Sequence, residues 1–347
     1  VSGTHGKTTT CSLIGSILHT AKKDPTLIIG GIVKSFNTNA VSGEGDIIVV
    51  EADEFDKTFL SLKPVISIIS NIEEEHLDCY QDFSDLKNAF YQFANNIPFY
   101  GFILTNIDSP NVLEIINRVK RPIIKYGIIK DADYNAKNIQ FDKNSSRFDL
   151  YYKNNKIDSI TIPIPGQHNI YNSLCAISLC LELGVDIQII KKSLEVFKGV
   201  ERRFDIKYQD KHNIYVDDYA HHPTEVRATI EAARKGWPDK EIISVFQPHL
   251  FSRTKQFYKD FAKSLSDSNK IILLDIYGSR ENKIKGVSSD LIKQELISSG
   301  YKNCILVKKE DLMKELKITH KKNQIIIAMG AGDLWMKGKE IIKYLYQ

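Results

Sequence analysis

The chain has 347 residues, 47 Lys and Arg against 43 Asp and Glu, a formal net charge of +4 and 42% hydrophobic residues, which is the composition of a globular protein. The length predicts two domains, and the weak charge without a dense basic run argues against binding to nucleic acid. Apolar stretches such as 47–50 and 325–329 are strand length, far below the ~20 residues of a membrane span, so we expect no membrane insertion. Five cysteines without a C-x-x-C spacing favour neither a disulfide framework nor a zinc site, and indicate a reducing cytoplasm.

Apolar runs of strand length alternate with helical patterns along the first part of the chain. This alternation predicts an α/β fold with mostly parallel sheets covered by helices. The expected strands are 27–29, 47–50, 65–69 and 102–105, and the expected helices are 8–20, 85–95, 110–119 and 169–183. Between residues 133 and 165, short alternating segments such as 148–152 and 159–162 predict antiparallel hairpins at one sheet edge.

A second α/β series begins after about residue 202. Its expected strands are 213–216, 242–246, 270–274, 304–307 and 324–328, and its expected helices are 223–235, 255–265, 289–298 and 334–346. We place the boundary near residues 199–203, which gives domains 1–202 and 203–347. The first is expected to be a P-loop ATPase domain with edge hairpins, and the second a Rossmann-like α/β domain.

The strongest local signal is Gly3-Thr4-His5-Gly6-Lys7-Thr8-Thr9, followed by a helical pattern. Glycines let the backbone wrap round a phosphate chain, the lysine can reach the β- and γ-phosphates, and the Thr8 hydroxyl can bind Mg²⁺. The expected ligand is a nucleoside triphosphate; a glycine-rich turn with a surface lysine is the alternative. Val1 stands where the usual loop has glycine, and the loop begins so close to the first residue that we expect a natural N-terminal region to be missing.

Two acidic segments follow predicted strands. Glu51-Ala52-Asp53-Glu54-Phe55-Asp56 comes directly after the strand at 47–50, at the edge where open α/β sheets bind ligands. Not all four carboxylates can be ligands, and Glu51 is the preferred one for Mg²⁺. The segment from Ser70 to Asp78 follows the next strand, and its His76 is a candidate second metal ligand or phosphate contact, although a single histidine is more often structural.

Amides and imidazoles follow further along the chain. His168, Asn169 and Asn172 open the helix expected at 169–183, and amides suit the donor and acceptor edge of adenine. Helix capping is the alternative role of Asn169. Asn172 lies inside the helix, where capping does not explain it.

The second domain holds three further clusters: Arg202-Arg203-Phe204-Asp205, the segment Asp217-Asp218-Tyr219-Ala220-His221-His222-Pro223-Thr224-Glu225, and the segment Phe246-Gln247-Pro248-His249-Leu250-Phe251-Ser252-Arg253-Thr254. The last two end predicted strands. Asp218, Tyr219 and His221 are the candidate functional residues of the second cluster, and the others are expected to cap or pack. Arg253 in the third can hold a carboxylate or a phosphate.

Together these segments, with Gly330-Ala331-Gly332-Asp333, resemble the ATP-dependent Mur ligases of bacterial cell-wall synthesis. The resemblance follows the chain in order over nearly its whole length. It implies that the family's first domain, which holds the UDP part of the substrate, is missing here. In the third cluster the family often has arginine where this chain has Leu250, and no equivalent of the carbamylated lysine of related ligases can be placed.

The resemblance also implies the roles of single residues. The ATP phosphates would be bound by Gly3, Thr4, His5, Gly6, Lys7, Thr8 and Thr9. Thr8 and Glu51 would hold one Mg²⁺, and His76 a second metal. Adenine would be faced by His168, Asn169 and Asn172, with Arg203 and Asp218 also contacting the nucleotide. Tyr219, His221 and Arg253 would lie near L-alanine and the muramyl carboxylate. Catalysis would depend on Lys7, Glu51, His76, His221 and Arg253.

The implied activity is the ATP-dependent joining of L-alanine to the carboxylate of UDP-N-acetylmuramate through an acyl phosphate, in the bacterial cytoplasm, by a monomer or weak homodimer. Three alternatives stay open. A recycling ligase would attach an intact murein tripeptide to the same UDP-muramic acid. The chain alone could be an ATP-binding module inactive in ligation. A P-loop phosphotransferase or regulatory NTPase would explain the first loop but leave the clusters of the second domain without a role.

Overall fold

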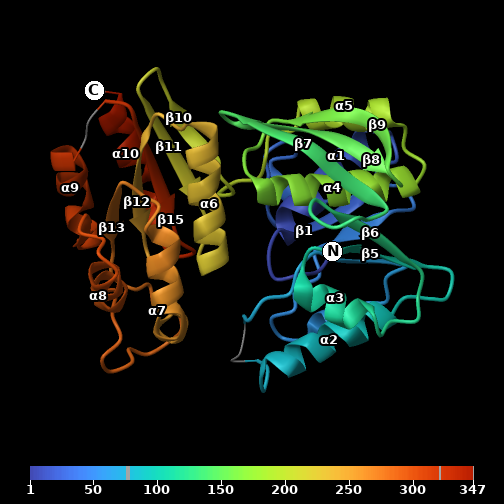
Figure 1. Ribbon diagram of the computed structural model, residues 1–347, viewed down its shortest axis with the longest axis horizontal. Coiled ribbons are helices and arrows are strands. Elements are labelled where there is room, and N and C mark those ends of the chain that lie inside the picture. Colours follow the sequence, from blue (N-terminus) through green and yellow to red (C-terminus); the bar gives the residue numbers. More distant parts are fainter. Residues whose placement is uncertain (76–78, 320–321, 347) are drawn as a thin grey trace. The chain divides into compact units, whose positions relative to one another are not determined.

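The computed structural model describes residues 1–75, 79–319 and 322–346. Its internal contacts divide the chain into two compact units, Val1–Glu201 and Arg202–Gln347. Each unit has its own sheets and hydrophobic core, so each is described by itself (Figure 1).

The first unit contains two sheets. The smaller has the order β2-β1-β3, and the larger has the order β4-β5-β6-β7-β8-β9. Strands β4 to β7 pair in parallel, whereas β7, β8 and β9 pair antiparallel, which confirms the predicted mixture of parallel strands and edge hairpins. The strands are β1 (Thr26–Val33), β2 (Thr38–Val41), β3 (Ile48–Val50), β4 (Ile66–Ile69), β5 (Phe102–Asn106), β6 (Ile123–Gly127), β7 (Tyr134–Asp142), β8 (Ser145–Tyr152) and β9 (Asn155–Ile162).

The first two residues connect the two sheets. Ser2 forms a parallel bridge with Ile69 at the end of β4. The Ala52 N–H, just after β3, donates to the Val1 carbonyl at 2.8 Å. The backbone before the glycine-rich loop therefore lies between β3 and β4, and the loop emerges at the edge where both strands end.

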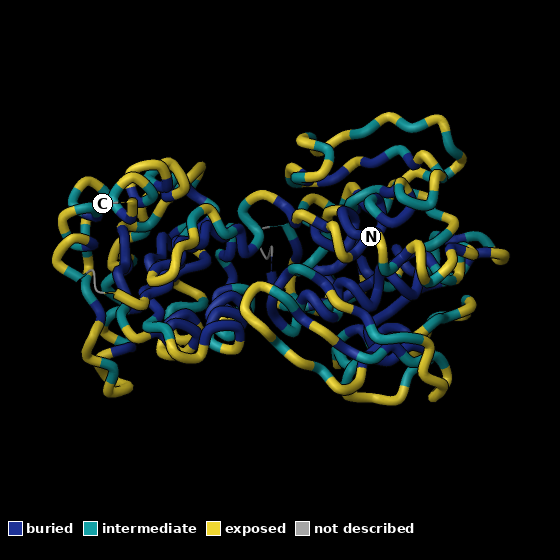
Figure 2. The backbone as a smooth tube through the Cα atoms, turned by 90° about the horizontal axis from the view of Figure 1, so that it is seen from above, coloured by how far each residue is buried: buried dark blue, intermediate teal, exposed yellow. Residues whose placement is uncertain are grey.

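Helices cover the larger sheet with two separate cores. One contains α1 (Lys7–Thr20), α4 (Gln167–Glu182) and α5 (Ile187–Glu195) with the inner sides of β7 to β9. The other contains the turn η1 (Thr58–Ser61), α2 (Phe83–Asn95) and α3 (Pro110–Ile116), where Phe59 packs on Phe90 and Phe93. Buried segments run through the interior and exposed ones follow the connecting loops (Figure 2).

The second unit is one six-stranded sheet of order β10-β11-β15-β12-β13-β14. Only the edge strand β10 runs antiparallel, which confirms a Rossmann-like α/β architecture. The strands are β10 (Asp205–Gln209), β11 (Asn213–Asp218), β12 (Glu241–Phe246), β13 (Lys270–Leu273), β14 (Cys304–Leu306) and β15 (Gln324–Met329). One face packs on α6 (Pro223–Gly236), α7 (Phe251–Leu265) and α8 (Asp290–Ser298), and the other on α9 (Leu312–Thr319), α10 (Gly338–Leu345) and the short turn η3 (Leu334–Lys337); the turn η2 (Lys309–Asp311) precedes α9.

Several predicted bounds were wrong. Helix α7 begins at Phe251 rather than 255, because the Leu250 carbonyl accepts from both the backbone and the hydroxyl of Thr254. Helix α3 ends at Ile116. Beyond it, the N–H groups of Arg118 and Val119 donate to the carbonyls of Ile115 and Ile116, three residues back, which is the tighter pattern of a turn. The helix expected at 334–346 is divided into η3 and α10 at Gly338. The elements α5, α9, β2, β6 and β10 were not predicted.

Among the helices that lie within the described residues, none combines the length and apolar character needed to cross a membrane.

Candidate functional site

The glycine-rich loop needs its glycines. Gly3 and Gly6 have φ of +133° and +82°, and both approach other groups closely. A Cβ on Gly3 would lie 2.2 Å from Ser70 Oγ, and one on Gly6 would lie 2.4 Å from Asn172 Oδ1. Gly6 is also the N-cap of α1, with no side-chain hydrogen bond capping the helix. The first N–H groups of α1 are therefore suited to bind an anion such as a phosphate.

The loop backbone is held by the segment that follows β4. Asn71 Oδ1 accepts from the His5 N–H at 2.8 Å, and Asn71 Nδ2 donates to the His5 carbonyl at 2.9 Å. Ser70 Oγ donates to the same carbonyl at 3.1 Å. The Glu73 N–H donates to Thr4 Oγ1 at 2.9 Å. The Asn71 carboxamide thus holds both the N–H and the carbonyl of His5, which makes the loop rigid.

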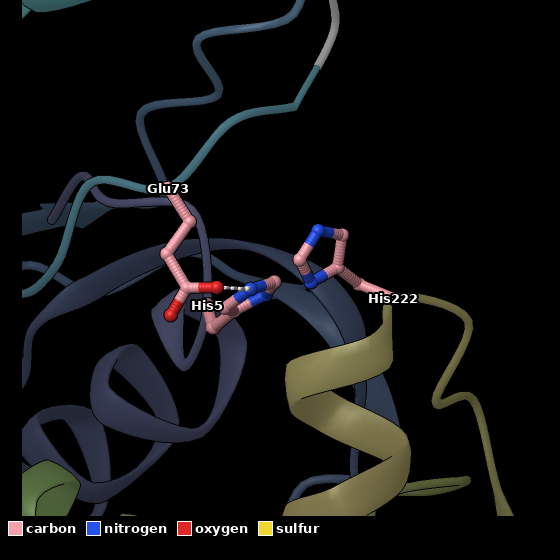
Figure 3. Close-up of side chains that lie close together, drawn as sticks. All are labelled: His5, Glu73 and His222. Atoms are coloured by element: carbon pink, nitrogen blue, oxygen red, sulfur yellow. Dashed lines mark ion pairs between the residues drawn. The ribbon is translucent and has the colours of Figure 1, made fainter. Parts of the chain in front are cut away.

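The His5 side chain lies beside a carboxylate. Its Nε2 is 3.5 Å from Glu73 Oε2, and Figure 3 shows the two side chains pointing toward one another. The same figure labels His222, which belongs to the second unit and caps the start of α6.

Lys7 forms a buried ion pair. Its Nζ is 2.7 Å from Glu54 Oε2 and 3.9 Å from Asp53 Oδ1. The side chains of Lys7 and Glu54 are 10% and 1% exposed. Burial by itself would lower the pKa of Lys7, but the carboxylates of Glu54 and Asp53 outweigh it and raise that pKa. The lysine is therefore a charged group at the start of α1.

Thr8 and Glu51 form the second polar contact of the loop. Thr8 Oγ1 donates to Glu51 Oε1 at 2.8 Å, and the Gly30 N–H donates to Glu51 Oε2 at 2.6 Å. A hydroxyl beside a carboxylate is the set of hard oxygen ligands that Mg²⁺ prefers. Thr9, the next residue, is buried within α1.

The four carboxylates after β3 have different surroundings. Asp53 Oδ1 accepts from the Phe55 N–H, and Asp56 Oδ1 accepts from the Thr58 N–H, so both shape the turn in the way that aspartates commonly do. Glu51 contacts Thr8, and Glu54 contacts Lys7. Of these four, the two glutamates therefore form hydrogen bonds with side chains of the glycine-rich loop, and Asp53 adds a longer ion pair with Lys7 at 3.9 Å.

The start of α4 packs behind the loop. Asn172 Oδ1 accepts from Thr10 Oγ1 at 3.3 Å, Asn172 Nδ2 donates to Asn169 Oδ1 at 3.2 Å, and Asn169 Nδ2 donates to the Pro165 carbonyl at 2.7 Å. Both asparagines are buried, and the N-cap of α4 is Gly166 rather than Asn169. His168 lies in the first turn of the helix. His76 lies outside the described residues.

Asp218 ends β11 as a fully buried carboxylate. It accepts from the N–H groups of Phe204 and Ala220 and from Thr229 Oγ1, at 2.9–3.1 Å. Burial raises its pKa to about 6, and Arg203, Thr229 and the Ala220 N–H limit the rise. Asp218 thereby fixes the turn before β10 to the end of β11.

Two arginines lie over one aromatic ring in the second unit. The guanidinium carbons of Arg202 and Arg203 lie 5.0 and 5.3 Å from the centre of the Tyr219 ring. Arg202 donates to the Gly330 carbonyl at 2.6 Å, and Arg203 forms an ion pair with Glu225 at 3.4 Å. Arg203 therefore contacts Tyr219, which follows β11. Arg202 links the same region to Gly330, which follows β15.

The predicted residues Tyr219, His221 and Arg253 are brought together through His249. His221 packs edge-on against the rings of Tyr219 and His249, with centroids 5.1 and 6.1 Å apart. Arg253 Nη1 lies 3.4 Å from His249 Nδ1, and Tyr277 stacks on the same imidazole. Burial, His221 and Arg253 lower the pKa of His249 to about 4, so this ring is neutral at pH 7.

Comparison with known proteins gives one consistent family. Residues 1–180 match the family described as the Mur ligase middle domain, and residues 202–332 match the Mur ligase, glutamate ligase domain. A UDP-N-acetylmuramate–L-alanine ligase of Endomicrobium trichonymphae is 42% identical over 99% of this chain and 75% of its own length.

This chain belongs to the Mur ligase family. Among solved members, the UDP-N-acetylmuramate–alanine ligase MurC of Thermotoga maritima is 26% identical with a TM-score of 0.83, and covers 99% of this chain and 74% of its own. A murein peptide ligase of Psychrobacter arcticus is 22% identical with a TM-score of 0.69 over 99% of this chain and 76% of its own, which shows a shared fold. The chain thus corresponds to about three quarters of a Mur ligase.

Sequence reasoning assigned no role to four residues that the structure places at the candidate sites: Glu54, Asn71, His249 and Tyr277. The first three lie within the motifs that carry the resemblance to Mur ligases. The sequence therefore indicated that they are near the site, but not which side chains they contact. Tyr277 lies outside these motifs, and its backbone bridge to His249 and the stacking of the two rings bring it to the cluster.

Proposed function

We propose that this Mur ligase catalyses the ATP-dependent joining of L-alanine to the carboxylate of UDP-N-acetylmuramate. The observation that carries the proposal is the similarity, at 42% identity over 99% of the chain, to a relative named for that reaction. The charged loop of the first unit supports the part of the reaction that uses ATP.

In this proposal the loop binds the phosphates of ATP. The backbone N–H groups at the start of α1 and the Lys7 ammonium supply positive charge, which in-line phosphoryl transfer needs more than a protein nucleophile. Thr8 and Glu51 would hold Mg²⁺, because their hydroxyl and carboxylate oxygens lie 2.8 Å apart. Mg²⁺ bound there supplies neutralisation of the phosphate charge.

The reaction proceeds in two displacements. A muramyl carboxylate oxygen attacks the γ-phosphorus of ATP, and ADP leaves with the electron pair of the broken bond. The neutral amine of alanine then attacks the acyl carbon; phosphate leaves with the electron pair of the broken carbon–oxygen bond, and the proton lost by the nitrogen balances as hydrogen phosphate. The other nucleotide contacts stay predictions: His168, Asn169, Asn172, Arg203 and Asp218.

For the acceptor, the proposal keeps the cluster of the second unit. Arg253 can pair with a carboxylate, and it lies beside His249, on which His221 packs, with Tyr219 packed on His221. They stay predicted contacts of L-alanine and the muramyl carboxylate.

The test follows phosphate release from Mg-ATP with UDP-N-acetylmuramate and L-alanine, the murein tripeptide or no acceptor. It is run on the chain alone and on the chain joined to the UDP-binding domain of a Mur ligase. Release that requires L-alanine is the expected result. A requirement for the tripeptide would assign the recycling reaction, and ATP binding without acceptor-dependent release in both proteins would reduce the function to nucleotide binding.

A further inference from the structure

Glu54, in the acidic turn after β3, is a buried carboxylate that the proposed chemistry does not use. The Glu54 side chain is 1% exposed, and only one of its oxygens, Oε2, contacts Lys7. The other, Oε1, is buried and makes no hydrogen bond to any residue within the described ranges. A buried carboxylate with one cationic partner is strongly destabilising when that partner is removed.

The backbone of Glu54 is fixed from outside the loop. Its carbonyl accepts from the buried Tyr80 hydroxyl and from the Lys57 N–H. Lys57 in turn lies over the Tyr80 ring and pairs with Asp85 at 2.8 Å. The Glu54 carboxylate is thus attached to a rigid turn, whereas the lysine side chain it contacts has four rotatable carbon bonds.

We propose that Glu54 is a positioning residue, which holds the Lys7 ammonium in the place where it meets the γ-phosphate of ATP. This rests on the proposed function and adds to it. Asp53 cannot take over the role, because its side chain is 64% exposed and 3.9 Å away. Glu51 cannot either, because its two oxygens are occupied by Thr8 and Gly30.

The first test compares nucleotide affinities of the 347-residue chain. Glu54→Gln keeps the shape and removes the charge, so we expect the Kd for ATP to rise tenfold or more and the Kd for ADP to rise less than threefold. A purely structural defect would weaken both nucleotides equally. Tighter binding of ATP by Glu54→Gln would show that the carboxylate competes with phosphate, and would overturn the proposal. Glu114→Gln is the control, because this carboxylate pairs with Lys87 between α3 and α2, and it should change either Kd less than twofold.

The second test is a double-mutant cycle. In a Lys7→Ala background, Glu54→Gln should change the Kd for ATP less than twofold, because no ammonium is left to position. Equal losses in both backgrounds would overturn the proposal.

The cycle also has a readout independent of nucleotide. Lys7→Ala leaves the buried Glu54 carboxyl without its cationic partner and should lower the unfolding midpoint by about 5–10 °C, whereas Lys7→Ala with Glu54→Gln should regain most of that loss. The more exposed pair Lys87 and Glu114, at 2.8 Å, joins α2 to α3 away from the loop; it is the matched control and should show no such recovery. Nucleotide binding and unfolding need no acceptor. The ligase assignment can therefore fail while the role of Glu54 is confirmed, and the role of Glu54 can fail while the ligase assignment is confirmed.

Discussion

Asp218 is the residue whose burial gives the clearest pH dependence. Burial raises its folded pKa to about 6, above the value of about 3.9 for an aspartate in an unfolded chain. The folded state therefore binds the proton more tightly, and its stability falls as the pH rises from about 4 to about 6. The expected loss is about 3 kcal/mol.

Asp218→Asn should remove this loss, since a carboxamide does not titrate. The measurement is urea unfolding at pH 4.5 and 6.5, followed by tryptophan fluorescence, because Trp237 and Trp335 both belong to the second unit. Thr229→Val removes a donor to the carboxylate and should make the dependence steeper. The difference in the free energy of unfolding between the unsubstituted protein and Asp218→Asn should therefore change with pH. An equal difference at pH 4.5 and pH 6.5 would contradict the assignment.

At the scale of elements, strands and loops were predictable where the pattern was strong. The order of strand, acidic segment and helix predicted that Glu51 and the glycine-rich loop lie at one sheet edge. Strands β3 and β4 do end at this edge, and Ser2 forms its bridge there. Which carboxylate would meet Lys7 was not predictable. That choice depends on the turns formed by Asp53 and Asp56 and on Lys57, whose φ is +64°.

Elements were missed where the local signal was weak. Strand β10 is an edge strand with alternating exposure, and only its pairing with β11 defines it. The division at Gly338 was hidden in a continuous helical pattern, because Gly338 itself has helical backbone angles, φ −55° and ψ −44°.

The segment after β4 acts on the loop as a unit, and Asn71 is its central contact. Asn71→Ala would leave the His5 N–H and carbonyl without the carboxamide that bonds both. Losing partners of this kind costs about 1–3 kcal/mol, so we expect the Kd for ATP to rise about tenfold as the loop loosens. Equilibrium binding of ATP measures the effect. Asn303→Ala, which removes a similar amide to backbone bond in the second unit, should leave the Kd unchanged.

At the scale of the whole molecule, the two units have separate hydrophobic cores, and the glycine-rich loop belongs to the first. A ligand that binds only the folded state stabilises it by about 2.7 kcal/mol at a hundred times its Kd. Mg-ATP should therefore raise the unfolding midpoint of the first unit by about 5–10 °C. Scanning calorimetry measures the shift, and tryptophan fluorescence identifies the transition of the second unit. Lys7→Ala should abolish most of the shift, because the loop then lacks its cation; an undiminished shift in that variant would place the ATP site away from this loop.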